Sequence, residues 1–188
     1  TITIGASGDT VNVVGTLQNN GSAVEVDSVT FKEGGTNFTN SLLVGTSSTG
    51  TLDAAQNNTG VGLGVFAALT SGDGNTAVGH SALLTATTGA GNTAVGINSL
   101  YSNTTADFNT AVGRQALFTN TTGARNSSLG LNVSYSNTTG SCNVSFGANA
   151  LYNNTTGDEN VAIGVSALCN NTTADHNNAV GFEALFCN

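Results

Sequence analysis

Hydrophobic and polar positions recur with a fixed period along most of the chain. From Ser41 onwards, an apolar residue followed by glycine, two further apolar positions and a polar Thr/Asn/Gly stretch return every 17 residues. The unit opens on a recurring asparagine, at Asn58, Asn75, Asn92, Asn109, Asn126, Asn143, Asn160 and Asn177. A fixed period predicts a stack of similar small units in place of a globular domain.

The consensus unit reads N-T-A-V-G-x-x-A-L-x-x-N-T-T-G-x-x, and its residues are numbered here as positions 1 to 17. Position 4 is always apolar and position 5 is always glycine, which favours a short strand ending at a sharp corner. Positions 8 and 9 are mostly small then large, which suits one helical turn or a second short strand. Within residues 109–125 we therefore expect Val112, Ala116 and Leu117 to fill the core and Gly113 to make the corner.

A unit that buries so few side chains is stable only against its neighbours, so the pattern predicts an all-β, parallel β-solenoid or β-roll, with room for a single helical turn in each coil. About nine coils spaced by ~4.8 Å would form a rod about 40 Å long. We expect the asparagines at position 1 to form a ladder from coil to coil.

The first part of the chain does not follow this period. TITIG, TVNVVGTL and VEVDSVTF alternate apolar and polar residues between Gly-Asp and Asn-Gly turns, as β-strands do. We predict two parts: a β-rich N-terminal shaft or attachment segment over residues 1–36 that pairs with other chains, and the repeat solenoid over residues 37–188.

Composition and charge narrow the function. Hydrophobic residues make up 38% of the chain, so the core is thin. Three Lys and Arg against 11 Asp and Glu provide no basic surface for nucleic acid. No apolar run reaches the roughly 18 to 20 residues of a membrane span. The three cysteines and two histidines lack zinc-ligand spacing, and we expect no metal and no cofactor.

The segments NTAVGHSAL, NTAVGINSL and NTAVGRQALFTNTTG resemble the repeats of bacteriophage tail-fibre and tail-spike-like proteins. They are similar, more distantly, to the coils of trimeric autotransporter adhesin heads. The resemblance implies a slender β-solenoid, usually trimeric, that serves attachment or scaffolding without a catalytic centre. It implies a place on the virion or the cell surface, with copies of the chain and a host-surface carbohydrate or receptor as partners.

Position 10 carries an aromatic stripe along one line of the rod. Its aromatic residues are Tyr101, Phe118, Tyr135, Tyr152 and Phe186. Two interpretations remain open: the rings pack between chains or neighbouring coils, or they present a surface to sugars or a receptor.

Two features would depend on an extracellular setting. Position 12 supplies sequons for N-glycosylation at Asn103, Asn120, Asn137, Asn154 and Asn171, which would set glycans along one edge; in a bacterial cytosol they would be bare turns. Cys169 and Cys187 lie one coil apart, so they are candidates for a disulfide or for free thiols.

Other chemistry is weakly supported. The acids at position 16, such as Asp107, fit solvated turns better than a calcium roll. Asp158 and Glu159 are the only adjacent acidic pair, and no groove of carboxylates marks a hydrolase, so we expect no enzyme. Position 2 varies too much for the flat threonine lattice of an ice-binding solenoid.

Two hypotheses for function follow. In the first, the chain is an attachment fibre whose repeats act as a rigid spacer and a surface for receptor or glycan. In the second, it is the protomer of an extracellular microbial filament, polymerising through its N-terminal β-segment. A carbohydrate-active enzyme on a β-solenoid is the third and disfavoured alternative.

Overall fold

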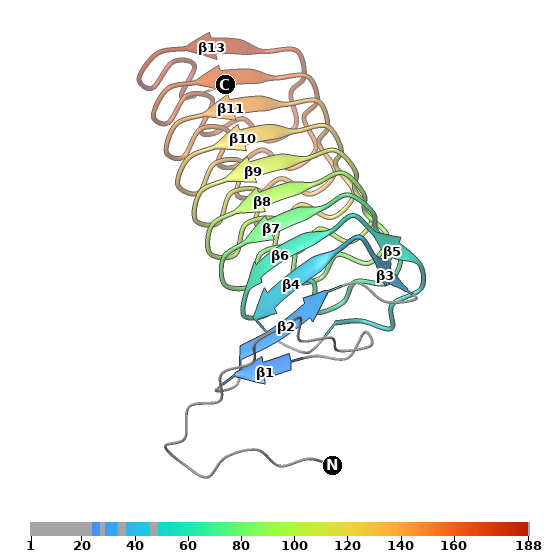
Figure 1. Cartoon of the computed structure of the whole chain (residues 1–188). Helices are drawn as coiled ribbons and strands as arrows, with labels where there is room; N and C mark the ends of the chain where they lie inside the picture. Colours follow the sequence, from blue (N-terminus) through green and yellow to red (C-terminus); the bar gives the residue numbers. More distant parts are fainter. Residues whose placement is uncertain (1–23, 27–28, 34–36, 46–48, 188) are drawn as a thin grey trace, which may run out of the picture.

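The computed structural model describes residues 24–26, 29–33, 37–45 and 49–187, and it is an open stack of coils (Figure 1). Much of the predicted N-terminal segment, including TITIG and TVNVVGTL, lies outside these residues. The described residues contain strands and turns but no helix. The strands are β1 (Val24–Val26), β2 (Val29–Glu33), β3 (Phe38–Thr39), β4 (Leu42–Gly45), β5 (Ala55–Gln56), β6 (Thr59–Gly62), β7 (Thr76–Val78), β8 (Thr93–Val95), β9 (Thr110–Val112), β10 (Ser127–Leu129), β11 (Val144–Phe146), β12 (Val161–Ile163) and β13 (Asn178–Val180).

One sheet runs the length of the stack and confirms the predicted parallel β-solenoid. Its order is β1-β2-β4-β6-β7-β8-β9-β10-β11-β12-β13, and every pair from β4 to β13 is parallel. Each residue pairs with the residue 17 further along, as Thr93 does with Thr110. At the N-terminal end β2 pairs antiparallel with β4, and β1 pairs antiparallel with β2. β3 and β5 form a small second parallel sheet.

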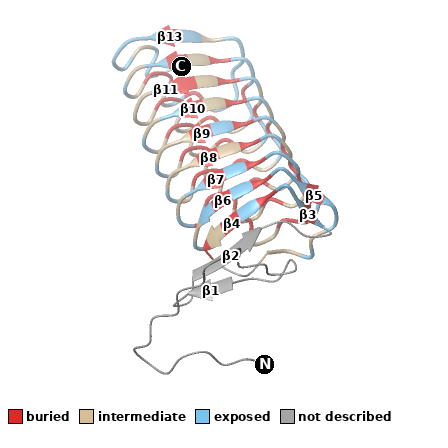
Figure 2. Ribbon diagram, viewed as in Figure 1, coloured by how far each residue is buried: buried red, intermediate tan, exposed pale blue. Residues whose placement is uncertain are grey.

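The interior of each coil is lined by positions 3, 8 and 9, and this corrects one expectation. Ala111, Ala116 and Leu117 are fully buried, whereas Val112 at position 4 is only half-buried. Because strand residues alternate between faces, position 3 of each three-residue strand points inward and positions 2 and 4 point outward. Figure 2 shows this alternation as a buried segment within the strands of the stack from β6 to β13. The valine predicted to fill the core therefore lies on the outer face.

Turns with positive φ, and no helical turn, bring the chain back across the coil. In the unit of residues 109–125, Gln115, Leu117 and Arg125 have φ values of 57°, 50° and 59°. The same three positions are left-handed in most other coils. Leu117 tolerates this conformation because its side chain is buried and its N–H bonds to the carbonyl of Val133 in the next coil, at 3.0 Å.

Position 17 gives a test of this backbone, because its side chain is exposed. Gly91 occupies this position with φ of 66°, and Arg125 has φ of 59°. We expect Arg125→Gly to leave the free energy of unfolding unchanged or raise it by up to about 1 kcal/mol, since glycine adopts the left-handed region freely. Arg125→Val is expected to lower it by about 1–2 kcal/mol. Chemical denaturation of the two variants measures the difference, and an equal effect of both would contradict the argument.

The coil of residues 126–142 shows how the core tolerates a change. Position 9 holds Ser134 in place of leucine, while position 8 holds the larger Val133 in place of alanine. The Ser134 hydroxyl lies 2.8 Å from that of Ser145 and 3.3 Å from that of Ser128. Because all three hydroxyls are buried and hydrogen-bonded to one another, the polar substitution leaves none of them without a partner.

Candidate functional site

Two buried asparagine ladders hold the coils in register. At position 1, Asn109 accepts a hydrogen bond at Oδ1 from the backbone N–H of Asn126 (2.9 Å), and its Nδ2 donates to the carbonyl of Gly123 (2.9 Å). The same backbone-to-Oδ1 bond links Asn75 to Asn58, and it continues to Asn177. The predicted ladder is confirmed. Its bonds replace the hydrogen bonds to water that these buried amides lose.

The second ladder is formed by the five predicted sequon asparagines of position 12. Asn120 donates from Nδ2 to Oδ1 of Asn103 (2.9 Å) and to the carbonyl of Gly123 (2.9 Å). Equivalent bonds from Nδ2 run through Asn137, Asn154 and Asn171, and all five asparagines are buried. Both hydrogens of the central amides are used, so a glycan on Nδ2 does not fit the intact stack. A structural role replaces the glycan row considered for Asn103, Asn120, Asn137, Asn154 and Asn171.

The aromatic stripe of position 10 is a stacked column. Tyr101 and Phe118 have ring centroids 5.0 Å apart, Phe118 and Tyr135 5.1 Å, and Tyr135 and Tyr152 5.2 Å. The rings are half-buried. Each ring covers a face of the next ring in the column. Of the contacts considered for these residues, those between neighbouring coils of the same chain are therefore present. The column stops at Cys169, and the more exposed Phe186 occupies the next coil.

The cysteines are all free, so the structure does not contain the disulfide considered between Cys169 and Cys187. The register explains this result. Position 10 stacks on position 10, so the residue one coil beyond Cys169 is Phe186, while Cys187 belongs to position 11. Burial raises the pKa of the Cys169 thiol, which keeps this group neutral at physiological pH.

A hollow lies beside the end of the aromatic column. It has a volume of about 310 Å³ and is lined by Asn132, Asn149, Tyr152 and Cys169. The Oδ1 atom of Asn132 is buried and has no hydrogen-bond partner. The sequence did not reveal this hollow, although the replacement of an aromatic residue by Cys169 was its visible signal.

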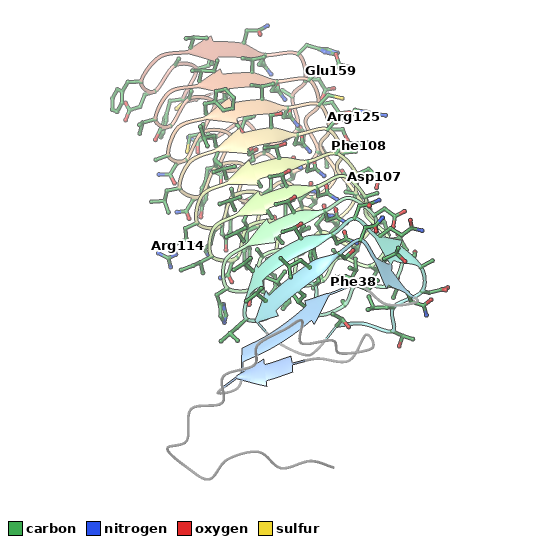
Figure 3. The ribbon with its side chains drawn as sticks, viewed as in Figure 1. Phe38, Asp107, Phe108, Arg114, Arg125 and Glu159 are labelled. Atoms are coloured by element: carbon green, nitrogen blue, oxygen red, sulfur yellow. The ribbon has the colours of Figure 1, made fainter. Side chains whose placement is uncertain are left out.

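The acids of position 16 act within the stack. The Oδ1 atom of Asp107 accepts the backbone N–H of Ala90 in the preceding coil, at 2.7 Å, and Asp73, Asp158 and Asp175 make the same bond. Figure 3 shows Asp107, Phe108, Arg125 and Glu159 along one edge of the rod, with Arg114 at the opposite edge. These acids therefore form hydrogen bonds between neighbouring coils and are also solvated turn residues.

The adjacent pair Asp158 and Glu159 is divided between two partners. Asp158 accepts the backbone N–H of Ser141, and Glu159 pairs with Nδ1 of His176 at 3.2 Å. Both side chains of this contact are largely exposed, so it contributes little to stability. Among the described residues, no group of three or more His, Cys, Asp and Glu side chains could hold a metal ion. In the same part of the chain, no helix is long and apolar enough to cross a membrane.

An exposed apolar surface, here called the outer stripe, runs along the rod. It consists of large apolar residues at positions 4 and 6, on either side of the glycine corner. Its members are Val61, Leu63, Val78, Ile97, Leu129, Leu131, Phe146, Ile163, Val165, Val180 and Phe182, each exposing between 36% and 74% of its surface. So many exposed large apolar residues along one line are uncommon on a monomeric protein.

Comparison with known proteins adds no relative. No family model matches the chain, and neither a curated protein nor a solved structure does. The rod itself offers three kinds of feature: two internal asparagine ladders, an aromatic column with a hollow beside its end, and the outer stripe.

Proposed function

We propose that the chain is a non-enzymatic structural rod of an attachment fibre, in which copies of the chain associate side by side. The outer stripe is the observation that carries this proposal. It has members in seven of the coils between β6 and β13 and is interrupted in the coil of residues 109–125, so a partner that covers it needs the same axial repeat. A second copy of the chain has that repeat. The ladders that fix the register make each copy a rigid spacer.

The size of the outer stripe fits an interface between copies. Eleven half-exposed side chains of about 150 Å² each present on the order of 800 Å², close to what one partner buries in a stable complex. Position 6 also carries Arg114 and His80, but most of its members are apolar. The proposal therefore moves the contact between chains from the position 10 rings, which stack within the chain, to positions 4 and 6.

The oligomeric state tests this proposal. We expect the chain to sediment as a closed oligomer, a trimer by the resemblance of its repeats, and the double variant Ile97→Glu/Leu131→Glu to dissociate at least tenfold more readily. Both side chains are about half exposed, so the fold is retained and circular dichroism is unchanged. Arg114→Glu is the matched control, because it places the same residue at position 6 without removing an apolar contact. A monomeric wild-type chain, or equal dissociation of both variants, would contradict the proposal.

A second candidate is the protomer of an extracellular filament that grows end to end. Its support is the axial repeat of the stack: each coil donates backbone hydrogen bonds to the next, as Leu117 does to Val133 at 3.0 Å, and a coil of a second copy could accept such bonds in the same way. Electron microscopy distinguishes the two candidates. Particles of variable length that shorten with Phe182→Asp would favour the filament, whereas particles of one length favour the fibre rod.

A further inference from the structure

The aromatic column is interrupted near the C-terminal end of the stack, where position 10 holds a cysteine in place of an aromatic residue. Rings occupy position 10 in four successive coils at steps of 5.0–5.2 Å, from Tyr101 to Tyr152. The next coil supplies Cys169, and the coil after that supplies Phe186. By the same step, Tyr152 and Phe186 stand two coils apart with one small thiol between them. The column therefore leaves a gap of about one ring at Cys169.

The hollow of about 310 Å³ borders this gap: Tyr152 and Cys169 line it from position 10, and Asn149 and Asn132 line it from position 7 of the coil of Tyr152 and of the coil before it. Its size is at the lower end of the range of small-molecule sites, which run from about 300 to 1,000 Å³. One six-membered sugar ring with its hydroxyl groups is an appropriate occupant for such a volume. The hollow is a shallow depression, largely open to solvent, so a ring at the end or in the middle of a longer glycan could enter it.

The lining selects an uncharged ligand that carries hydroxyl groups. Tyr152 provides an aromatic ring, and Asn132 and Asn149 provide amide donors and acceptors. A purely aromatic ligand would cover these amides without forming hydrogen bonds to them, which is unfavourable. No charged side chain lines the hollow, which favours an uncharged ligand over an ion.

We propose that this hollow binds one pyranose ring of a neutral glycan. The apolar face of the sugar lies on the ring of Tyr152, and the amides of Asn149 and Asn132 form hydrogen bonds with its hydroxyl groups. The thiol of Cys169 leaves the space that an aromatic residue would fill. The inference deepens the proposed attachment function, on which its biological meaning rests, by naming the class of ligand and the place where it binds.

Binding of simple sugars tests the proposal. The probes are methyl glycosides of glucose, galactose and mannose, together with N-acetylglucosamine, each followed by saturation-transfer NMR and titration. A ligand of this size in a site open on one side is expected to bind with a Kd of about 1–10 mM. We expect at least one of the four probes to do so. Absence of binding up to about 100 mM by all four, or tighter binding of indole than of every sugar, would overturn the proposal.

Filling the gap provides the decisive variant. Cys169→Tyr would complete the column and is expected to weaken sugar binding at least tenfold. Leu84→Tyr is the matched control: it adds the same residue at position 10 beyond the other end of the column, where it leaves the hollow open, and should bind as the wild type does. If Cys169→Tyr fails to fold, Tyr152→Leu removes the aromatic face at similar volume and should abolish binding. If the folded variant, whether Cys169→Tyr or Tyr152→Leu, binds the sugar as tightly as the wild type does, the proposed site is refuted.

The outcomes for this site and for the fibre rod are separable. A closed oligomer that binds none of the sugars would overturn the pyranose site and leave the rod standing. A monomer that binds sugar, and loses it with Cys169→Tyr, would support the site and overturn the side-by-side rod.

Discussion

Gly96→Ala is expected to lower the free energy of unfolding by about 4 kcal/mol or more, a loss that only severe steric or strain effects reach. Gly96 has φ of 131°, and a Cβ there would lie 2.5 Å from the carbonyl oxygen and 2.6 Å from the carbonyl carbon of Gly113 in the next coil. Both atoms belong to the backbone, so neither can rotate away. The coils would have to separate at the corner, which would break the hydrogen bonds on either side of it.

Gly181→Ala separates the clash from the backbone strain. Gly181 has nearly the same φ, 132°, but a Cβ there meets only Ala184, at 3.9 Å. Its cost should be limited to the strained conformation, about 1–3 kcal/mol. Chemical denaturation of both variants, monitored by circular dichroism, gives the comparison. Equal losses would show that close stacking of the glycine corners does not determine stability.

Asn109→Ala is expected to lower the free energy of unfolding by about 3 kcal/mol, because it leaves one buried backbone N–H without an acceptor and creates a small cavity. The substitution removes the acceptor of the Asn126 backbone N–H, which is bonded to Oδ1 at 2.9 Å. That N–H is buried in the stack and has no water to replace the bond. The carbonyl of Gly123 loses one donor but keeps Nδ2 of Asn120. Thermal unfolding measures the loss.

The chain itself suggests the controls for this variant. Ser41 occupies position 1 in an earlier coil, and its hydroxyl accepts the N–H of Asn58 at 2.8 Å. Asn109→Ser should therefore recover part of the stability that alanine loses. Asn153→Ala removes an exposed amide bond to Asn170 and should change stability by less than about 0.5 kcal/mol. If the alanine and serine variants at position 109 are equally stable, the ladder acceptor is not the source of the effect.

The fold could be predicted from the sequence because its determinants repeat. A strict 17-residue spacing of asparagine and glycine requires that like residues stack on like, and the register follows from that alone. The inward residue of the strand was predicted wrongly because the larger apolar side chain was assigned to the interior. The coil is narrow and is already filled by Leu117, so only a small residue such as Ala111 fits opposite. The outward-facing Val112 then contributes to an external surface.

The functional surfaces were harder to predict than the fold. The line of rings at position 10 is visible in the sequence, but their spacing and mutual stacking depend on the structure. The sequons follow a local pattern, whereas the burial of Asn120 depends on how the turn folds back over the core. The hollow at Cys169 arises from a difference between neighbouring coils, and a consensus obscures such differences.

The direction of the hydrogen bonds sets how such a rod responds to force. From β4 to β13 the strands lie across the long axis, so the bonds between coils, such as that from Thr121 to Thr138, point along it. Tension applied at the two ends of the rod acts first on the hydrogen bonds between the outermost coil and its neighbour. The outermost coil then detaches before the next set of hydrogen bonds is strained. Each event would release 17 residues, about 60 Å of extended chain. Such a rod would yield in small equal steps under tension, dissipating a sudden load gradually while its remaining coils keep their shape.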